Sequence, residues 1–387
     1  MTTFLLSAGD ASGELHAAAL VTALRTLHPE ARFLGLGGAE MEKAGVELVV
    51  HQREIAIGGL VEVLRDLRQI TSAWGRLNRA LRETRPDVVI LVDAPDFNIP
   101  FARRAKRAGS PVLYYVSPQV WAWRRGRIGR IARRVDRLAV IFPFEVEVYR
   151  ETSLRVDFVG HPLVDRLSHL ADQRDTGAAR EALGLDPQRP LVALLPGSRR
   201  NEVRGTLPLQ LRAAAALHAR QPTAGFAVGV AASIPREVVD AALAAARLPA
   251  GMALQVFEAR TYEVLLASDV ALAKPGTVTV ESAMLGTPLV VAARANSLTA
   301  FIMRRVVKLP SITMPNLIAE ERVVPEFLQQ DAEPERIAAA LQSLLSGPAR
   351  ARQLAALGRV REQLGAGGAA QRVAAIAAGM VGGSRAS

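Results

Sequence analysis

Asp93 is the residue whose type and position best suit acid–base chemistry. It directly follows a largely apolar run, residues 87–92, which is typical of a strand buried in a sheet. A carboxylate at the rim of such a sheet has an apolar medium behind it, which raises its pKa and favours the role of general base. A capping residue and a covalent nucleophile are the alternatives for this aspartate. Asp96 and Asn98 in the same loop are typical turn-forming residues.

Two loops in the second half of the chain combine glycine with residues that bind phosphate. In the first loop, Gly197, Ser198 and Arg199 follow the strand predicted at residues 191–195. Glycine allows close approach of the backbone, serine donates a hydrogen bond, and arginine offers two parallel donors to phosphate oxygens. This loop therefore predicts a diphosphate site, with a plain turn and a surface arginine as the alternative.

The second of these loops leads into a helix. Gly276 and Thr277 follow the strand predicted at residues 270–273 and precede a helix predicted over residues 278–285. A helix N-terminus favours an anion, so Thr277 is placed for phosphate. Glu281 lies one turn further on the same face, where its carboxylate could accept hydrogen bonds from the two hydroxyls of a ribose. A solvated helix glutamate is the alternative.

Small and polar residues also follow the first predicted strand, residues 3–7. Asp10, Ser12 and Gly13 lie between this strand and an amphipathic helix. Small residues let the backbone approach a ligand, and the helix N-terminus favours an anionic group. The alternative is a tight turn in which Asp10 or Ser12 caps the helix. The full G-x-G-x-x-G pattern is missing, so the loop is a weak match to a nicotinamide-dinucleotide site.

A run of aromatic and basic residues follows the strand predicted at residues 112–116. Trp121 and Trp123 combine a polar N–H group with a large apolar ring, which suits sugar faces and membrane interfaces. Beyond them, four arginines recur at helical spacing and are expected to share one helix face: Arg127, Arg130, Arg134 and Arg137. An anion-binding face is favoured over an ordinary solvated surface, because this segment contains almost no acidic residues.

The candidate residues described above follow predicted strands, and these strands must end at one edge of a sheet to bring the residues together. Short β-branched runs alternate with helical stretches, which is typical of βαβ units and parallel sheets. The predicted strands cover residues 3–7, 32–36, 87–92, 112–116, 137–141, 155–159, 191–195, 226–231, 254–257, 270–273 and 289–292. We expect an α/β fold of two Rossmann-like domains, residues 1–167 and 185–347, facing across a crevice that holds the functional site. Residues 348–387 are predicted to be helical and to pack back on the N-terminal domain.

The composition excludes several classes of protein. The chain has 387 residues, a net charge of +11 and no cysteine, which excludes disulfides and thiolate metal sites. No uncharged apolar stretch reaches the roughly 18–20 residues of a membrane-spanning helix, and the first residues lack a signal-peptide pattern, so we expect a cytoplasmic protein. The positive charge predicts an anionic partner, and 5% aromatic residues without a known module argue against nucleic acid.

The motifs together resemble the lipid-A-disaccharide synthase family over nearly the whole chain. The matching segments are Ser12-Gly13, Asp93 to Asn98, Val116-Ser117-Pro118, Val120 to Arg124, Phe158, Gly160-His161-Pro162, Leu194 to Arg199, Gly276-Thr277, Thr279, Glu281 and Pro315-Asn316-Leu317. The resemblance implies a GT-B-type, inverting glycosyltransferase that needs neither metal nor cofactor and acts at the inner face of the cytoplasmic membrane. It would join UDP-2,3-diacylglucosamine to 2,3-diacylglucosamine 1-phosphate through a β-1,6 bond and release UDP.

The resemblance also implies roles for individual residues. Asn316 is expected to contact the nucleotide or the donor sugar, and the acceptor is expected to bind at the Asp10, Ser12 and Gly13 loop. Asp93 would take the proton of the acceptor hydroxyl, while charged side chains would stabilise the departing UDP in place of a metal. A homodimer is left open.

Peripheral binding to an anionic membrane surface is expected through the Trp121 to Arg137 region. The apolar stretch Ile55 to Leu67 is expected to act together with this region, through the stripe Ile57, Leu60, Val61 and Leu64, although a core-facing helix would have the same pattern.

The chain departs from the family pattern at a few positions. Asp10 stands where the family usually has Glu, Glu14 where it usually has Asp, Pro275 where it usually has Ser, and Ala293 where it often has Tyr. Two other functions are compatible with the residues. One is a UDP-N-acetylglucosamine epimerase on the same two-domain plan, and the other is a basic binding protein for nucleic acid or acidic lipid surfaces.

Overall fold

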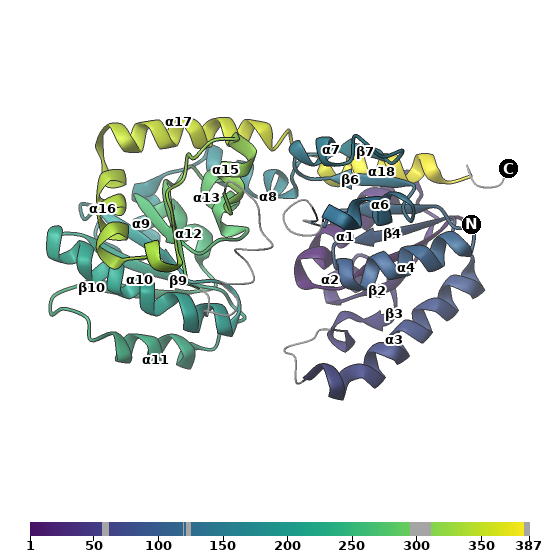
Figure 1. Cartoon of the computed structure of the whole chain (residues 1–387), viewed down its shortest axis with the longest axis horizontal. Helices are drawn as coiled ribbons and strands as arrows, with labels where there is room; N and C mark the ends of the chain where they lie inside the picture. The colour runs from purple at the N-terminus through teal and green to yellow at the C-terminus, as the bar shows by residue number, and fades with distance from the viewer. Residues whose placement is uncertain (56–61, 119, 121–124, 295–310, 383–387) are drawn as a thin grey trace. The chain divides into compact units, whose positions relative to one another are not determined.

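The computed structural model describes residues 1–55, 62–118, 120, 125–294 and 311–382 (Figure 1). The contacts within the chain divide it into two compact units. Unit 1 consists of Met1–Asp165 and Leu364–Ser387, and unit 2 consists of Arg166–Gln363. Unit 1 is therefore assembled from two separate pieces of the sequence.

The described part of unit 1 is built on a seven-stranded parallel sheet of order β3-β2-β1-β4-β5-β6-β7. Its strands are β1 (Thr3–Ala8), β2 (Arg32–Gly37), β3 (Glu47–His51), β4 (Val88–Val92), β5 (Val112–Tyr115), β6 (Arg137–Val140) and β7 (Arg155–Phe158). Its helices are α1 (Ala11–Leu27), α2 (Ala39–Lys43), α3 (Glu62–Thr84), α4 (Pro95–Arg107), α6 (Ile128–Ala132), α7 (Phe144–Val148) and α18 (Ala369–Met380), with the short 3-10 helices η1 (Gln52–Glu54) and η2 (Arg125–Arg127). The helix α8 (Pro162–Asp172) begins in unit 1 and ends in unit 2.

Helices cover both faces of this sheet, which explains why its central strands are apolar throughout. All five residues of β4 are buried, as are five of the six in β1. Alternate residues of the strands form one core with α3, α4 and α6. α1 and the C-terminal α18 pack on each other and on β4. Strands that are buried on both faces are expected to be continuous hydrophobic runs, as these are.

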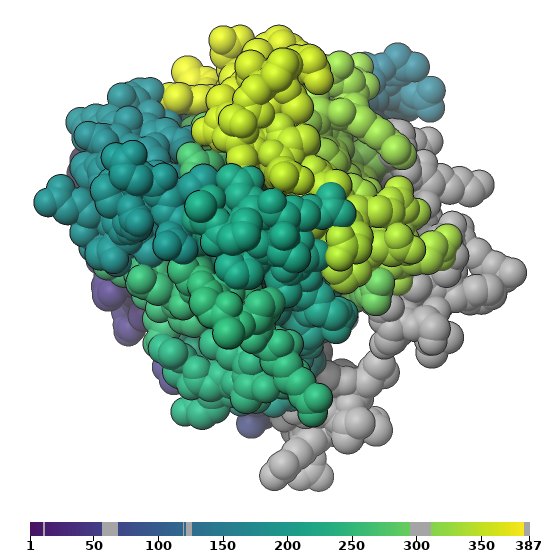
Figure 2. All heavy atoms as spheres, turned by 90° about the vertical axis from the view of Figure 1, so that its left-hand side faces the viewer, coloured from purple at the N-terminus to yellow at the C-terminus, as the bar shows by residue number. Residues whose placement is uncertain are grey.

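The described part of unit 2 repeats this plan with a six-stranded parallel sheet of order β10-β9-β8-β11-β12-β13. Its strands are β8 (Leu191–Leu195), β9 (Gly225–Val230), β10 (Ala253–Glu258), β11 (Val270–Ala273), β12 (Leu289–Ala293) and β13 (Glu326–Leu328). Its helices are α9 (Thr176–Ala182), α10 (Arg200–Arg220), α11 (Arg236–Ala246), α12 (Thr261–Ala267), α13 (Val278–Met284), α15 (Met314–Ala319), α16 (Pro334–Leu345) and α17 (Gly347–Gln363), with the 3-10 helix η3 (Gln329–Asp331). α10 packs on α11 and α16, and α17 packs on α16, so the yellow-green end of this unit lies against its teal and green segments (Figure 2).

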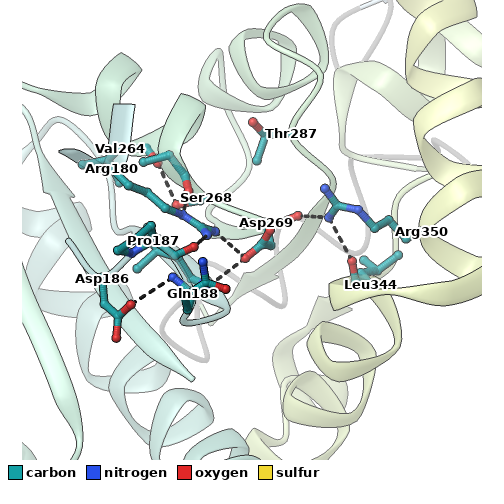
Figure 3. Close-up of polar contacts among 12 residues, drawn as sticks. Arg180, Asp186, Pro187, Gln188, Val264, Ser268, Asp269, Thr287, Leu344 and Arg350 are labelled. Carbon is teal, nitrogen blue, oxygen red and sulfur yellow. Dashed lines mark hydrogen bonds and ion pairs between the residues drawn. The ribbon is translucent and has the colours of Figure 1, made fainter. Parts of the chain in front are cut away.

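A buried arginine joins the first helix of unit 2 to its sheet (Figure 3). Arg180 of α9 donates to the carbonyl oxygens of Ala267 and Pro187 at 2.9 and 2.8 Å. It also donates to the Asp269 carboxylate at 2.7 Å, and the same carboxylate oxygen accepts from the Leu191 N–H at 2.8 Å. Because Asp269 and Leu191 lie where β11 and β8 begin, this network fixes the amino ends of the two central strands.

In both sheets the order of the strands reverses at one point, between β1 and β4 in unit 1 and between β8 and β11 in unit 2. Open α/β sheets bind ligands outside the carboxyl ends of the strands at such a point. The last residues of these strands are paired in register, Ala8 with Val92 and Leu195 with Ala273. The loops that follow them therefore begin side by side within each unit.

The predicted fold class, two parallel α/β sheets with a helical C-terminal region, is confirmed. The structure adds two strands that were not predicted, β3 and β13, and each lies at an edge of its sheet. Among the described residues, no helix is both long enough and apolar enough to cross a membrane.

Candidate catalytic and nucleotide sites

The backbone at Asp93 leaves β4 in an uncommon conformation. Asp93 and Ala94 have φ angles of 47° and 44°, in the left-handed region that non-glycine residues rarely adopt. Hydrogen bonds hold this turn, because the Asp93 N–H donates to the Tyr115 carbonyl at 3.1 Å and the Tyr114 hydroxyl donates to the Asp93 carbonyl at 2.5 Å. The strand is thereby turned sharply at the residue that was predicted to act as a base.

The side chain of Asn98 stabilises the same turn through hydrogen bonds. Asn98 is fully buried in the first turns of α4, whereas the sequence indicated a turn-forming residue of the loop. Its side-chain amide donates to the carbonyls of Ser7, Val92 and Asp93 at 3.2, 3.0 and 2.8 Å, and its amide oxygen accepts from the Ser7 hydroxyl at 2.6 Å. Asn98 therefore joins the carboxyl ends of β1 and β4.

The Asp93 carboxyl group lies in a medium that disfavours its charge. Its pKa is raised to about 6, mainly by burial and also by the neighbouring Asp10 carboxylate, and the Ala94 N–H opposes the rise. Such a pKa suits a proton acceptor at neutral pH, where the base is ionised but still takes up a proton readily.

The loop after β1 lies beside Asp93 within unit 1. A Cβ placed on Gly9 would come within 2.8 Å of the Ala94 Cβ, so glycine is needed for this close approach. The Asp10 carboxylate accepts from the Gly13 N–H at 2.7 Å and so caps α1, which is the alternative that the sequence left open for this residue. Ser12 is exposed in the first turn of α1, and Gly13 is buried against Val92.

A cavity of about 540 Å³ lies within unit 2 at the carboxyl ends of β8 and β11. Six of the seven residues predicted to bind the nucleotide line it: Gly197, Ser198, Arg199, Gly276, Thr277 and Glu281. These residues come from two loops and the helix α13, which the register of β8 and β11 brings together. The sequence separation between the two loops is about 80 residues, and the strand order alone explains their proximity.

The two glycines of this cavity adopt conformations that favour glycine. Gly197 has a φ of 127° and Gly276 a φ of 152°. A Cβ on Gly197 would come within 2.6 Å of a Glu202 carboxylate oxygen. The same oxygen accepts from the Ser198 N–H at 3.1 Å, and Arg199 lies 3.5 Å from the other oxygen while remaining largely exposed. In the first loop, the Ser198 N–H and the Arg199 guanidinium group thus both lie next to the Glu202 carboxylate on one side of the cavity.

Glu281 is held in place by a tyrosine that the sequence did not single out. The Tyr262 hydroxyl donates to the Glu281 carboxylate at 3.0 Å, and Arg166 of α8 donates to the Tyr262 hydroxyl at 3.0 Å. Burial raises the pKa of the Glu281 carboxyl group, and the hydrogen bond from Tyr262 and the charge of Arg166 oppose the rise. A carboxylate fixed on one oxygen in this way is suited to accept hydrogen bonds from ligand hydroxyls on the other.

The structure does not bring Asn316 into this cavity. Asn316 is 3% exposed in α15, where its amide donates to the Val324 carbonyl at 2.9 Å and to the Glu326 carboxylate at 3.1 Å. Its amide oxygen accepts from the Val324 N–H at 2.7 Å. These contacts attach α15 to the edge strand β13, and the expected contact of Asn316 with the donor stays a prediction.

The basic segment after Trp123 is not one helix. α6 ends at Ala132, and the chain then turns into β6, where Arg137 donates to the Asp157 carboxylate at 3.0 and 2.7 Å. The expectation that Arg137 shares a helix face with the preceding arginines is therefore wrong, because a strand begins at this residue. Trp121 and Trp123 lie outside the described residues.

The other predicted arginines lie near α4. Arg127 forms an ion pair with Asp96 at 2.9 Å, Arg130 is exposed, and Arg134 donates to the Ile99 carbonyl at 3.2 Å. The stripe that begins at Ile57 also falls largely outside the described residues, and for Leu64 only the backbone is described. In the described part of the chain, no cluster of three or more His, Cys, Asp or Glu side chains is placed to hold a metal ion.

Comparison with known proteins decides the family. The family model described as lipid-A-disaccharide synthetase matches residues 4–378. The chain belongs to this family. The lipid-A-disaccharide synthase of Geobacter metallireducens (strain ATCC 53774 / DSM 7210 / GS-15) is 44% identical to it over 382 residues, which cover 98% of each sequence. As a member of the lipid-A-disaccharide synthase family, the chain is a glycosyltransferase.

Solved structures of distant proteins show the same fold. The calicheamicin glycosyltransferase CalG4 has a TM-score of 0.60 at 16% identity, with 99% of each chain covered. UDP-GlcNAc 2-epimerase from Neisseria meningitidis, bound to UDP-GlcNAc, has a TM-score of 0.67 at 13% identity, with 97% of this chain and 99% of that chain covered. The lipid-A-disaccharide synthase family thus shares the GT-B-type plan with enzymes of other activities, and the fold alone does not separate a transferase from an epimerase.

Proposed function

We propose that this chain transfers 2,3-diacylglucosamine from its UDP derivative to 2,3-diacylglucosamine 1-phosphate. The products are UDP and a β-1,6-linked disaccharide 1-phosphate, formed with inversion at the anomeric carbon. The observation that carries the proposal is the unit 2 cavity, which six residues predicted for a nucleoside diphosphate line together. Membership of the lipid-A-disaccharide synthase family supplies the substrate class.

The donor side of the reaction is assigned to unit 2. The Ser198 hydroxyl and the exposed guanidinium of Arg199 bind the diphosphate, and Glu281 accepts hydrogen bonds from the ribose hydroxyls. UDP gains negative charge as it departs, so donors that are already in place lower the barrier without reorganisation. These groups act on the leaving group through side chains and the backbone, and we propose no metal ion in this role.

The acceptor side is assigned to unit 1. The C6 hydroxyl of the acceptor gives its proton to the Asp93 carboxylate as its oxygen attacks the anomeric carbon of the donor. The bond from that carbon to the β-phosphate oxygen breaks, and its electron pair leaves with UDP. A single displacement on an α-linked donor yields the β-linked product. The acceptor is proposed to bind beside Asp93, at Asp10, which caps α1, and at Ser12 and Gly13 in the first turn of that helix.

We further propose that the protein acts in the cytoplasm and binds the inner face of the membrane peripherally. The support lies in the basic surface, which we define as five arginines of α4 and of the segment from α6 to β6: Arg103, Arg107, Arg130, Arg133 and Arg134. The charges of the other four lower the pKa of Arg134, although burial of its side chain has the largest effect. Arginines gathered in this way attract anionic lipid headgroups.

The reaction is tested with purified protein, the acylated UDP donor and the acylated 1-phosphate acceptor in buffer containing EDTA. Mass spectrometry is expected to show the disaccharide 1-phosphate in an amount equal to the UDP released, and NMR is expected to show the β linkage. The Asp93→Asn variant serves as the matched control and should form at least about 100-fold less product. Product that appears only after Mg²⁺ is added would contradict the metal-free mechanism.

The epimerase alternative is tested in the same assay without acceptor. Incubation with UDP-N-acetylglucosamine alone is expected to leave the sugar unchanged. Formation of its 2-epimer, together with no disaccharide from the acylated pair, would overturn the proposed function.

A further inference from the structure

A lysine that the sequence analysis did not select lies in the wall of the nucleotide cavity. Lys274 directly follows β11 and lines the cavity together with the two glycine loops. A Cβ placed on Gly197 would lie 3.1 Å from the Lys274 Cδ, and one placed on Gly276 would lie 3.5 Å from its Nζ. The lysine side chain therefore runs between the two loops to which the diphosphate is assigned.

The position of the ammonium group is set by a carboxylate. Lys274 Nζ donates to Glu202 at 2.8 Å, and both side chains are about one-fifth exposed. Glu202 in turn accepts from the Ser198 N–H at 3.1 Å, so it is anchored to the first loop. An ammonium group has three N–H donors, and Glu202 engages one of them.

We propose that Lys274 is a further leaving-group residue, whose ammonium contacts the β-phosphate of UDP, and that Glu202 positions it. This inference rests on the proposed function, since it assigns another residue to the same site. When the bond between the anomeric carbon and the phosphate oxygen breaks, the electron pair passes to the diphosphate. Lys274 stays protonated throughout and stabilises the added charge, and Arg199 does so from the neighbouring loop.

Lysine and arginine are suited to different parts of this task. An ammonium group is a compact charge that fits between two backbone loops, whereas a guanidinium group is a broad planar fork. The chain contains four lysines among its 48 basic residues, so arginine is its usual cation. Because the chain has only three other lysines, the modification of Lys274 by an amine-specific reagent can be measured separately.

Binding measurements separate a phosphate contact from a purely structural ion pair. Calorimetry is carried out with UDP and with uridine, which lacks phosphate, on the wild type and on Lys274→Met. We expect the variant to bind UDP at least about tenfold more weakly and to bind uridine as the wild type does. Equal weakening for both ligands would mean that the substitution damages the whole cavity, and it would overturn the assignment.

A double variant tests a second explanation, in which Lys274 only neutralises Glu202. Removal of the lysine leaves the Glu202 charge next to the diphosphate, and this charge alone would weaken UDP binding. In Lys274→Met/Glu202→Gln that charge is also removed. We expect UDP binding to remain weakened in the double variant. Recovery of wild-type affinity would show that Lys274 has no phosphate contact and would overturn the proposal.

Chemical modification provides an independent measurement on the wild-type protein. Reductive methylation followed by mass spectrometry of peptides is expected to label Lys274 more slowly in UDP than in uridine. Lys43 and Lys106, which form exposed ion pairs in unit 1, serve as references and should be labelled at the same rate in both. Equal labelling of Lys274 in both ligands overturns this inference. Failure of the wild type to bind UDP at all instead contradicts the proposed function.

Discussion

At Asp93, burial and a neighbouring carboxylate raise the pKa of the same carboxyl group, to about 6. A general base works only in its ionised form. We therefore expect kcat/KM to fall about tenfold per pH unit below pH 6 and to level off above it. Initial rates with the acylated substrates between pH 5 and 8 measure this profile. A flat profile across that range would remove Asp93 from the role of base.

The ionised Asp93 carboxylate is expected to lower the free energy of unfolding of unit 1. The rise from its ordinary pKa of 3.8 to about 6 corresponds to about 3 kcal/mol. A raised pKa in an acid means that folding is favoured while the group is protonated and that this advantage is lost as the pH rises through 6. Asp93→Asn should therefore raise the melting temperature at pH 8 and change it little near pH 4. A variant that melts lower than the wild type at pH 8 would contradict this reading.

Arg199 and Glu281 are expected to bind different parts of the nucleotide. Arg199→Ala should weaken UDP binding by about tenfold and leave uridine binding unchanged, whereas Glu281→Gln should weaken the binding of both ligands. Arg236→Ala is a matched control, since this exposed arginine of α11 pairs with Asp240 and Glu258 and does not line the cavity. Calorimetry with both ligands decides, and a uridine affinity that is unchanged in Glu281→Gln would place the ribose elsewhere.

Residue types at strand ends predicted much of the candidate site. Six nucleotide-binding residues were chosen because glycine and polar residues follow apolar strands, and the structure gathers them around one cavity. Lys274 stands in such a position too, and the same rule could have found it. The contacts of Tyr262 and Asn98 could not be predicted in this way, because they join elements whose proximity depends on the order of the strands.

The prediction of whole strands and helices from the sequence has the same limit. β3 and β13 were not predicted, and each forms the edge of its sheet, where one neighbouring strand is missing. The three residues of β13 are only half-buried, so they lack the continuous apolar pattern of the inner strands. The arginine spacing after Trp123 indicated a long helix, but helical spacing continues by chance into β6. Spacing alone does not reveal where a helix ends.

The amino ends of the central strands in unit 2 provide a test at this scale. Arg180→Met removes the charged partner of the Asp269 carboxylate and three hydrogen bonds of a buried side chain, and it should lower the free energy of unfolding by about 3 kcal/mol. The cavity lies at the opposite ends of the same strands, so UDP affinity at 20 °C or so should persist. Arg220→Met, which breaks an exposed pair with Glu335, is the control and should cost less than about 1 kcal/mol. Equal destabilisation by both changes would refute a structural role for the network.

At the scale of the whole molecule, the chain has a net charge of +11. Its binding to an anionic surface therefore depends on how that charge is distributed over the molecule. Changing three arginines of the basic surface, Arg130, Arg133 and Arg134, to Glu should reduce co-sedimentation with anionic vesicles, because each arginine near such a surface contributes about 1 kcal/mol. Added salt should weaken binding of the wild type.

The control for this experiment carries the same change of charge on unit 2. Arg220, Arg236 and Arg336 are exposed and are changed to Glu together. This control is expected to bind vesicles nearly as the wild type does. Equal loss in both triple variants would show that total charge, and not the basic surface, governs attachment.

The two-piece composition of unit 1 has a consequence for synthesis on the ribosome. The Leu364 carbonyl accepts from the His161 N–H, the Asp165 carboxylate accepts from the Gly368 N–H, and α18 packs on α1. All of residues 166–363 are translated before α18 exists. Unit 2 can therefore complete its fold first, while the face of α1 that packs on α18 remains exposed. Nascent chains on ribosomes stalled after residue 363 should bind a ribosome-associated chaperone through unit 1. They should be released once α18 emerges from the ribosome.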